Sequence, residues 1–259
     1  TTATNNFVAA VGITSGRNIQ LVDAGAIDLG ASAITGTLAV TATTGGDITD
    51  SAAISVGGTS TFTAANGQDI ILDSASTYTG TVAFVGTTLA NVTINDSGAF
   101  DLAALTLTGN LSVTSGGAIS DSGVIDVDGT SSFTTGSANI DIDNATGNGL
   151  TGAVSFTTTG TGDVTFDNGT TAINLGTVSV GQNLEVQSGG AITDSGIITV
   201  GGTASFTTDL SDKPITINSQ NAISGQVTFS TTGTDGDVNF DNGATAISLG
   251  VISTGDIGG

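Results

Sequence analysis

Aspartate and asparagine side chains recur along this chain where short apolar segments end, and these side chains are well suited to binding a cation. Ten such positions span 241 − 23 = 218 residues, so nine intervals average about 24 residues: Asp23, Asp50, Asp73, Asn95, Asp121, Asp143, Asp167, Asp194, Asn218 and Asp241. Carboxylates stacked about 5 Å apart repel one another, and Ca²⁺ prefers oxygen ligands. The candidate calcium ligands are Asp121, Asp143, Asp167 and Asp194, expected at one corner of successive coils.

A structural interpretation of the same residues is favoured over the calcium site. Asp and Asn suit tight corners because their side chains accept hydrogen bonds from nearby backbone N–H groups. The glycine-aspartate nonapeptide that builds calcium-binding β-rolls is absent, and "GTDGDVNFD" at 233–241 is only superficially similar to it. Calcium therefore remains the alternative, and no other cofactor is expected.

Catalytic chemistry is not expected from this chain. Outward acid pairs such as Asp126 with Asp128 could serve a glycosidase. However, the chain has no His, no Cys and no Trp, and no long loop interrupts its pattern to build a cleft. A lyase acting on acidic polysaccharides would need basic side chains, and only Arg17 and Lys213 are present. We expect no enzyme and no catalytic residues.

The charge of the chain limits its partners. Twenty-three acidic residues against two basic ones give a formal net charge of −21. Such a surface repels nucleic acid and anionic lipid, and no apolar run approaches the ~18 residues needed to span a membrane. We therefore expect no nucleic acid partner and no membrane insertion. The chain begins without Met and ends part-way through a repeat at "TGDIGG", so it is expected to be a fragment of a longer protein.

Internal repeats organise the whole chain. "GGAISDSGVIDVDGTSSFTT" at 116–135 returns as "GGAITDSGIITVGGTASFTT" at 189–208. Leu38, Leu111 and Leu184 are equivalent, and both 111 − 38 and 184 − 111 equal 73. The expected domain is a single one over 1–259, and its repeat units are 1–35 (partial), 36–108, 109–180 and 181–254.

Short alternating strands fill each repeat. In "VSF" (154–156), "VTF" (164–166) and "INL" (173–175) the first and third side chains point inward and the middle one outward. Three such strands per ~24-residue period predict an all-β fold, a parallel β-solenoid of 10–11 coils with three coils per ~73-residue repeat. One inner ladder is expected to run through Val40, Phe62, Phe84, Val113, Phe133, Phe156, Val186, Phe206 and Phe229.

The repeats resemble those of a known family. "GNLSVTSGGAISDSG" (109–123) and "NLEVQSGGAITDSGIITVGG" (183–202) are similar to repeats of filamentous-haemagglutinin-type proteins. Those proteins are large adhesins that Gram-negative bacteria export by two-partner secretion. The resemblance implies a right-handed parallel β-helix at the cell surface, outside the cell. The family's N-terminal secretion domain, with its Asn-Pro motifs, has no counterpart here.

The resemblance implies a structural function, the stalk or fibre segment of a secreted surface adhesin. Its partners would be neighbouring repeats or other copies of the protein, and a host or cell-surface ligand would bind to regions outside this chain. Two alternatives stay open. One is a subunit of an extracellular filament built by end-to-end stacking of solenoids, and the other is a calcium-bridged component of a surface layer.

Overall fold

The structure is a computed structural model that describes residues 5–144 and 147–255. These residues contain thirty β-strands and no α-helix, and they group into two compact units. The first unit comprises Thr1–Gly117 and Asp121–Gly129, and the second comprises Ala118–Ser120 and Thr130–Gly259. No helix in the described part of the chain is long and apolar enough to cross a membrane. The ends of the predicted domain, 1–4 and 256–259, and residues 145–146 lie outside the described residues.

The strands of the first unit are short, and most alternate between buried and exposed side chains. They are β1 (Val11–Gly16), β2 (Ile19–Asp23), β3 (Ile27–Ile34), β4 (Leu38–Ala42), β5 (Ile48–Asp50), β6 (Ile54–Val56), β7 (Ser60–Thr63), β8 (Ile70–Tyr78), β9 (Val82–Val85), β10 (Val92–Asp96), β11 (Phe100–Leu102), β12 (Leu105–Leu107), β13 (Leu111–Ser115) and β15 (Ile125–Val127).

The strands of the second unit follow the same pattern. They are β14 (Ile119–Asp121), whose first two residues belong to this unit, β16 (Ser131–Thr135), β17 (Ile140–Ile142), β18 (Gly149–Leu150), β19 (Ala153–Thr157), β20 (Val164–Asp167), β21 (Ile173–Val180), β22 (Leu184–Ser188), β23 (Ile192–Asp194), β24 (Ile198–Val200), β25 (Ala204–Ser211), β26 (Ile215–Ile217), β27 (Ala222–Ile223), β28 (Gln226–Thr232), β29 (Val238–Phe240) and β30 (Ser248–Thr254).

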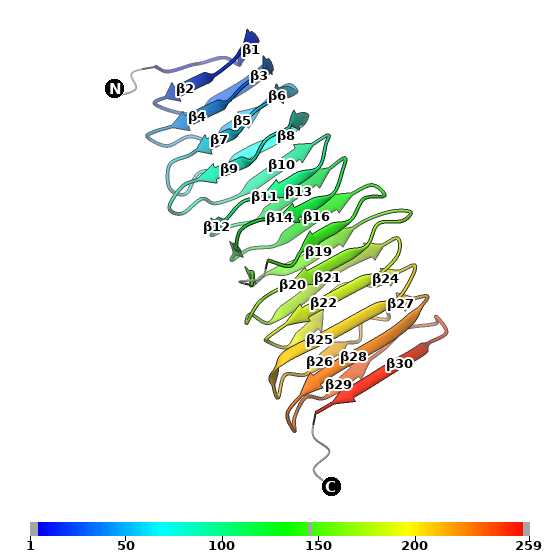
Figure 1. Ribbon diagram of the computed structural model, residues 1–259. Coiled ribbons are helices and arrows are strands. Elements are labelled where there is room, and N and C mark those ends of the chain that lie inside the picture. The colour runs from blue at the N-terminus through cyan, green and yellow to red at the C-terminus, as the bar shows by residue number, and fades with distance from the viewer. Residues whose placement is uncertain (1–4, 145–146, 256–259) are drawn as a thin grey trace. The chain divides into compact units, whose positions relative to one another are not determined.

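Each unit is a β-solenoid, because each strand pairs in parallel with its counterpart one coil later. In the first unit β4, β5 and β6 form one coil, and β7 then returns to lie on β4 (Figure 1). In the second unit β22, β23 and β24 form a coil and β25 returns to β22 (Figure 1). The predicted all-β parallel solenoid is therefore confirmed.

The coils are shorter than the sequence predicts, and they differ in length. The register pairs Ile19 with Leu38 in one coil and Leu38 with Ser60 in the next. The described chain makes about 12 turns of roughly 21 residues. The sequence therefore predicts too few coils, each of them too long. The expectation failed because the Asp and Asn positions used to count coils do not all occupy the same corner.

The prediction of three coils per repeat is correct to the nearest whole coil, and the number of strands in one repeat gives a more exact value. From β4 to β12 the chain forms ten strand segments, because β8 bends and pairs with β5 through Ile70 and with β6 through Tyr78. Ten segments at three per coil make three coils and one additional strand. Consequently Leu38 in β4 and its repeat equivalent Leu111 in β13 lie in different stacks: β4 pairs with β7, and β13 pairs with β10.

The same additional strand divides the predicted inner ladder. All nine of its residues are buried, as expected. They form separate stacks, however: Val40, Phe62 and Phe84 pair in order in the first unit, whereas Val113 pairs with Ile94 instead. The single continuous ladder is therefore wrong, although the burial on which it was based is right.

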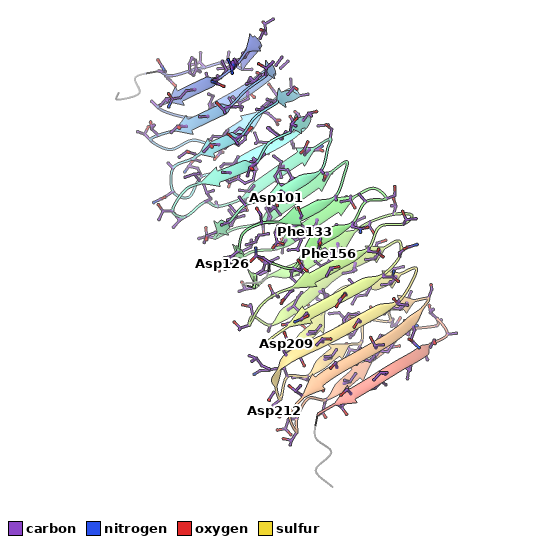
Figure 2. The ribbon with its side chains drawn as sticks, viewed as in Figure 1. Asp101, Asp126, Phe133, Phe156, Asp209 and Asp212 are labelled. Atoms are coloured by element: carbon purple, nitrogen blue, oxygen red, sulfur yellow. The ribbon has the colours of Figure 1, made fainter. Side chains whose placement is uncertain are left out.

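Aromatic rings stack along these inner columns. In the second unit Phe133 and Phe156 lie with ring centroids 5.6 Å apart and planes 16° from parallel (Figure 2). Phe206 and Phe229 repeat the arrangement at 5.7 Å and 17°. Neighbouring coils therefore bury their rings against each other, which is how short strands with few apolar residues build a continuous core.

Candidate functional site: the polar corners of the coils

Two of the four predicted calcium ligands are close neighbours. Asp143 and Asp167 lie in successive coils, because Ile142 pairs with Phe166 in the β17–β20 register. Burial raises the pKa of the Asp167 carboxyl, and the negative charges of Asp209 and Asp143 raise it further. These carboxylates repel each other, as the sequence predicts.

Of the other two predicted ligands, Asp194 does not lie in that column. Asp194 lies in β23 and pairs with Leu175 of β21, whereas Asp167 pairs with Gln187 of β22. Asp121 belongs to the first unit, and the other three belong to the second. The predicted column of four is therefore wrong, because Asp194 lies in a different stack of strands from Asp143 and Asp167.

The described residues contain no cluster suited to a metal ion. Within 5–144 and 147–255, no group of three or more His, Cys, Asp or Glu side chains is arranged to hold one. Asp194 instead accepts hydrogen bonds from the backbone N–H groups of Asn218 (2.9 Å) and Ser219 (3.1 Å) and from Nδ2 of Asn221 (2.8 Å). Its carboxylate thus secures the corner of the next coil, which is the structural interpretation of these aspartates.

A second set of Asp and Asn side chains links coils just before the strands begin. In the first unit Oδ1 of Asp47 accepts a hydrogen bond from the backbone N–H of Asp69 (2.9 Å), one coil later. Oδ1 of Asp69 accepts from the backbone N–H of Asn91 (2.9 Å), and Oδ1 of Asn91 accepts from that of Asn110 (2.8 Å). In the second unit Asn139, Asp163 and Asn183 form the same ladder, the last to Thr203. Sequence reasoning missed these residues. Their signal is an Asp or Asn directly before the first Ile, Leu or Val of a strand.

The best-satisfied corner lies in the second unit, and we call it the amide corner: Asp194, Asn221, Ile223 and Asn242. Asn221 Oδ1 accepts from the backbone N–H of Ile198 (2.7 Å), and its Nδ2 donates to Asp194. Asn242 Oδ1 accepts from the N–H of Ile223 (2.8 Å), and its Nδ2 donates to the carbonyl oxygens of Ile223 (3.0 Å) and Thr245 (3.2 Å). Each buried amide thereby uses both its donor and its acceptor.

The corresponding positions of the first unit hold different residues, which we call the acid corner: Asp50, Ser76, Tyr78 and Asp96. All four are buried. The N–H of Ile54 donates to Ser76 (2.9 Å), and the Ser76 hydroxyl is 3.5 Å from Oδ2 of Asp50.

Two polar atoms of the acid corner have no hydrogen-bond partner. Oδ1 of Asp96 accepts from the N–H groups of Tyr78 (3.2 Å) and Gly98 (3.1 Å), but its Oδ2 and the Tyr78 hydroxyl are buried without partners. Burial raises the pKa of the Asp96 carboxyl above its ordinary value, although the N–H groups of Gly98 and Tyr78 act in the opposite direction. Burial also raises the pKa of Asp50, and that of the Tyr78 hydroxyl well above its usual range. The acid corner thus contains two buried polar atoms without a hydrogen-bond partner, Oδ2 of Asp96 and the Tyr78 hydroxyl oxygen.

The repeat of this chain matches a family model described as repeats of unknown function (DUF5649). Three copies match, at residues 16–85, 89–157 and 161–230. The chain belongs to this family. The starts of the DUF5649 copies differ by 89 − 16 = 73 and 161 − 89 = 72, which agrees with the period of the equivalent leucines. The matched copies begin at different positions within the repeat from the units 36–108, 109–180 and 181–254. No curated protein and no solved structure matches the chain.

The matched DUF5649 repeats contain the whole acid corner and all of the amide corner except Asn242, which lies beyond the third copy. Asp50 and Tyr78 fall in the first copy and Asp96 in the second, while Asp194 and Ile223 fall in the third. These corners join one coil to the next through hydrogen bonds, in which side chains bind backbone groups that are far away in the sequence.

Proposed function

We propose that this chain is a structural segment, a stalk or fibre portion, of a secreted bacterial cell-surface adhesin. The observation that carries the proposal is the tandem of DUF5649 repeats, in which each coil pairs in parallel register with the coil before it. Repeats of this kind contact only their neighbours, so adding one adds length without a new fold. The resemblance to filamentous-haemagglutinin-type repeats supplies the extracellular setting.

The outward positions of the strands are consistent with a spacer. The second residues of β17, β20 and β22 are Asp141, Thr165 and Glu185, which are polar and alternate with the buried residues on either side. A surface of net negative charge keeps neighbouring copies apart and soluble. The proposal assigns the chain no catalytic step, and it leaves ligand binding to other parts of the adhesin.

A repeat-deletion experiment tests this proposal. The chain is displayed on cells between a surface anchor and a distal epitope, and residues 109–180 are deleted so that Gly181 takes the place of Gly109. We expect the remaining coils to fold and the epitope to move closer to the cell by about 16 Å, which is ten strands at three per coil and ~4.8 Å per coil. Electron microscopy of antibody-labelled cells measures the distance.

The control deletion removes 109–144, which is not a whole repeat and joins unlike strands. It should misfold and lose the epitope's defined position. The stalk proposal fails if the whole-repeat deletion also misfolds, or if the displayed repeats alone bind host cells as tightly as an intact adhesin.

A second candidate, the filament subunit, is favoured by one observation at the end of the second unit. Strand β30 pairs with β28, and its Leu249, Val251 and Ile252 are 49%, 75% and 46% exposed. An apolar strand edge is a template for another strand, and β1 of a second copy would supply one. Light scattering against protein concentration tests it: growth that Val251→Asp abolishes supports the filament, and a monomer at all concentrations excludes it.

A further inference from the structure

Asp96 stands where the other repeats carry a buried asparagine. The turns "INDSG" (94–98), "FDNG" (166–169) and "FDNG" (240–243) are equivalent, so Asp96 corresponds to Asn168 and Asn242. In all three turns Oδ1 accepts the backbone N–H of the preceding coil, at 3.2 Å from Tyr78, 2.8 Å from Leu150 and 2.8 Å from Ile223. The three side chains therefore enter the core in the same orientation.

The second side-chain atom distinguishes the three sites. Nδ2 of Asn168 donates to the carbonyl oxygens of Leu150 (3.0 Å), Thr171 (3.2 Å) and Ala172 (3.1 Å). Nδ2 of Asn242 donates to the carbonyl of Ile223 in the same way. The site is thus lined by hydrogen-bond acceptors and requires a donor.

In the first unit the atom at that place is Oδ2 of Asp96. Asp96 is 1% exposed, and this oxygen has no partner. An ionised carboxylate has only acceptors, so it would face carbonyl oxygens without a donor in between. A protonated carboxyl has the shape of the asparagine side chain and, like it, has both an acceptor and a donor, although it has one donor hydrogen where the amide has two.

We propose that Asp96 is a proton-binding site: its carboxyl is held neutral and donates from Oδ2 toward the carbonyl of Tyr78, as asparagine does in the second unit, so that coil stacking in the first unit weakens when the proton is lost. No covalent bond forms or breaks other than the O–H bond, and the proton exchanges with solvent. The site lies in the interior of the solenoid and is independent of the stalk proposal.

Burial disfavours the charged form of Asp96, and the backbone N–H groups of Gly98, Tyr78 and Ser97 act in the opposite direction. Burial raises the pKa of the Tyr78 hydroxyl on β8, and the negative charges of Asp50 on β5 and of Asp96 itself raise it further. On β13 the residue in register is Ser115, which does not titrate, and its hydroxyl donates to the carbonyl of Gly98. Asp101 of β11 accepts from the Ser122 hydroxyl. Among the described residues no basic side chain stabilises an ionised Asp96.

The direction of the pH effect follows from the raised pKa of Asp96 in the folded chain. Between the ordinary value of 3.8 and that raised value, the folded chain holds a proton that the unfolded chain releases. The contribution to stability is therefore fully present below pH 3.8 and is lost as the pH rises through the folded pKa.

The test measures thermal unfolding of the full chain from pH 4 to pH 8 with three variants. Asp96→Asn supplies the donor permanently, Asn168→Asp installs the proposed proton site in the second unit, and Asp126→Asn removes one exposed charge in the first unit (Figure 2). Carbon-13 NMR of the Asp96 carboxyl follows its protonation directly.

We expect Asp96→Asn to raise the melting temperature at pH 8 by a few degrees and to leave it nearly unchanged at pH 4. Asn168→Asp should add a pH dependence of the same sign, while Asp126→Asn should follow the wild type. Because Asn168→Asp can fail to fold at pH 8, the Asp96→Asn profile and the NMR titration decide the matter independently. The proposal is overturned if Asp96→Asn shifts the melting temperature equally at both pH values, or if the Asp96 carboxyl titrates at or below 3.8.

Discussion

The acid corner of the first unit and the amide corner of the second unit occupy equivalent positions of the same repeat. Each has a carboxylate at the end of a strand, Asp50 in one and Asp194 in the other. The amide corner satisfies its carboxylate with Asn221 and its buried backbone with Asn242. The acid corner leaves two buried oxygens unpaired.

The difference shows that a solenoid tolerates a poorly satisfied corner when its neighbours are well packed. Tyr78 packs edge-on against Phe62 at 6.1 Å, and Ile54 is held by the Ser76 hydroxyl. Stability in such an array is a sum of neighbour terms, so one weak corner lowers the total without destroying the register. The predictions below test this comparison, from the largest expected effect to the smallest.

A carboxylate placed among the stacked rings of the second unit should be far more damaging than Asp96 is in the first. Phe156→Asp removes a ring that contacts both Phe133 and Phe166, and it buries a charge where the side chains are apolar. We expect a loss of about 4 kcal/mol or more in the free energy of unfolding, measured by urea titration. Phe156→Leu is the control and should cost about 1–2 kcal/mol. A similar loss for both variants would show that the buried charge is not what makes Phe156→Asp damaging.

Truncating the two corners should have unequal effects. Asn242→Ala leaves the N–H and the carbonyl of Ile223 unpaired and should cost about 2–3 kcal/mol. Asp96→Ala at pH 8 should cost less than about 1 kcal/mol, because it also removes a poorly solvated carboxyl. Denaturant unfolding of both variants at pH 8 gives the comparison. Equal losses would show that the corners are energetically alike.

Removing the unpaired hydroxyl of the acid corner should stabilise the first unit. Tyr78→Phe keeps the ring against Phe62 and eliminates a buried oxygen without a partner. The expected gain is about 1 kcal/mol, seen as a rise in melting temperature. The apolar Ile223 at the equivalent position of the amide corner supports this direction. A decrease in melting temperature would indicate that the hydroxyl forms a hydrogen bond in solution.

Calcium should have the smallest effect. The carboxylates Asp194 and Asp69 already accept two or more hydrogen bonds from neighbouring coils. We expect millimolar CaCl₂ to change the melting temperature no more than NaCl of equal ionic strength. A rise specific to calcium would restore the predicted metal site, because a ligand of the folded state stabilises it by mass action.

Much of the fold could be predicted from local patterns. Alternation in segments such as "VSF" and "VTF" identifies the strands, because successive side chains of a strand point to opposite faces. The same alternation correctly predicted that Phe133, Phe156 and Phe206 are buried. The recurrence of equivalent leucines at a constant spacing predicted the repeat. These inferences need only the order of residues along one strand or one repeat.

Only the tertiary structure decided the length of a coil, the ten-strand repeat and the roles of the aspartates. Each depends on which residue of the preceding coil lies opposite, and the separation of such partners along the chain varies from corner to corner. Asp194 binds the next corner with both of its carboxylate oxygens, whereas Oδ2 of Asp96 is buried without a partner, although both residues end a short apolar strand in similar sequence. The sequence determines which side chains face inward because that depends on neighbours along one strand, whereas their partners depend on the register between coils.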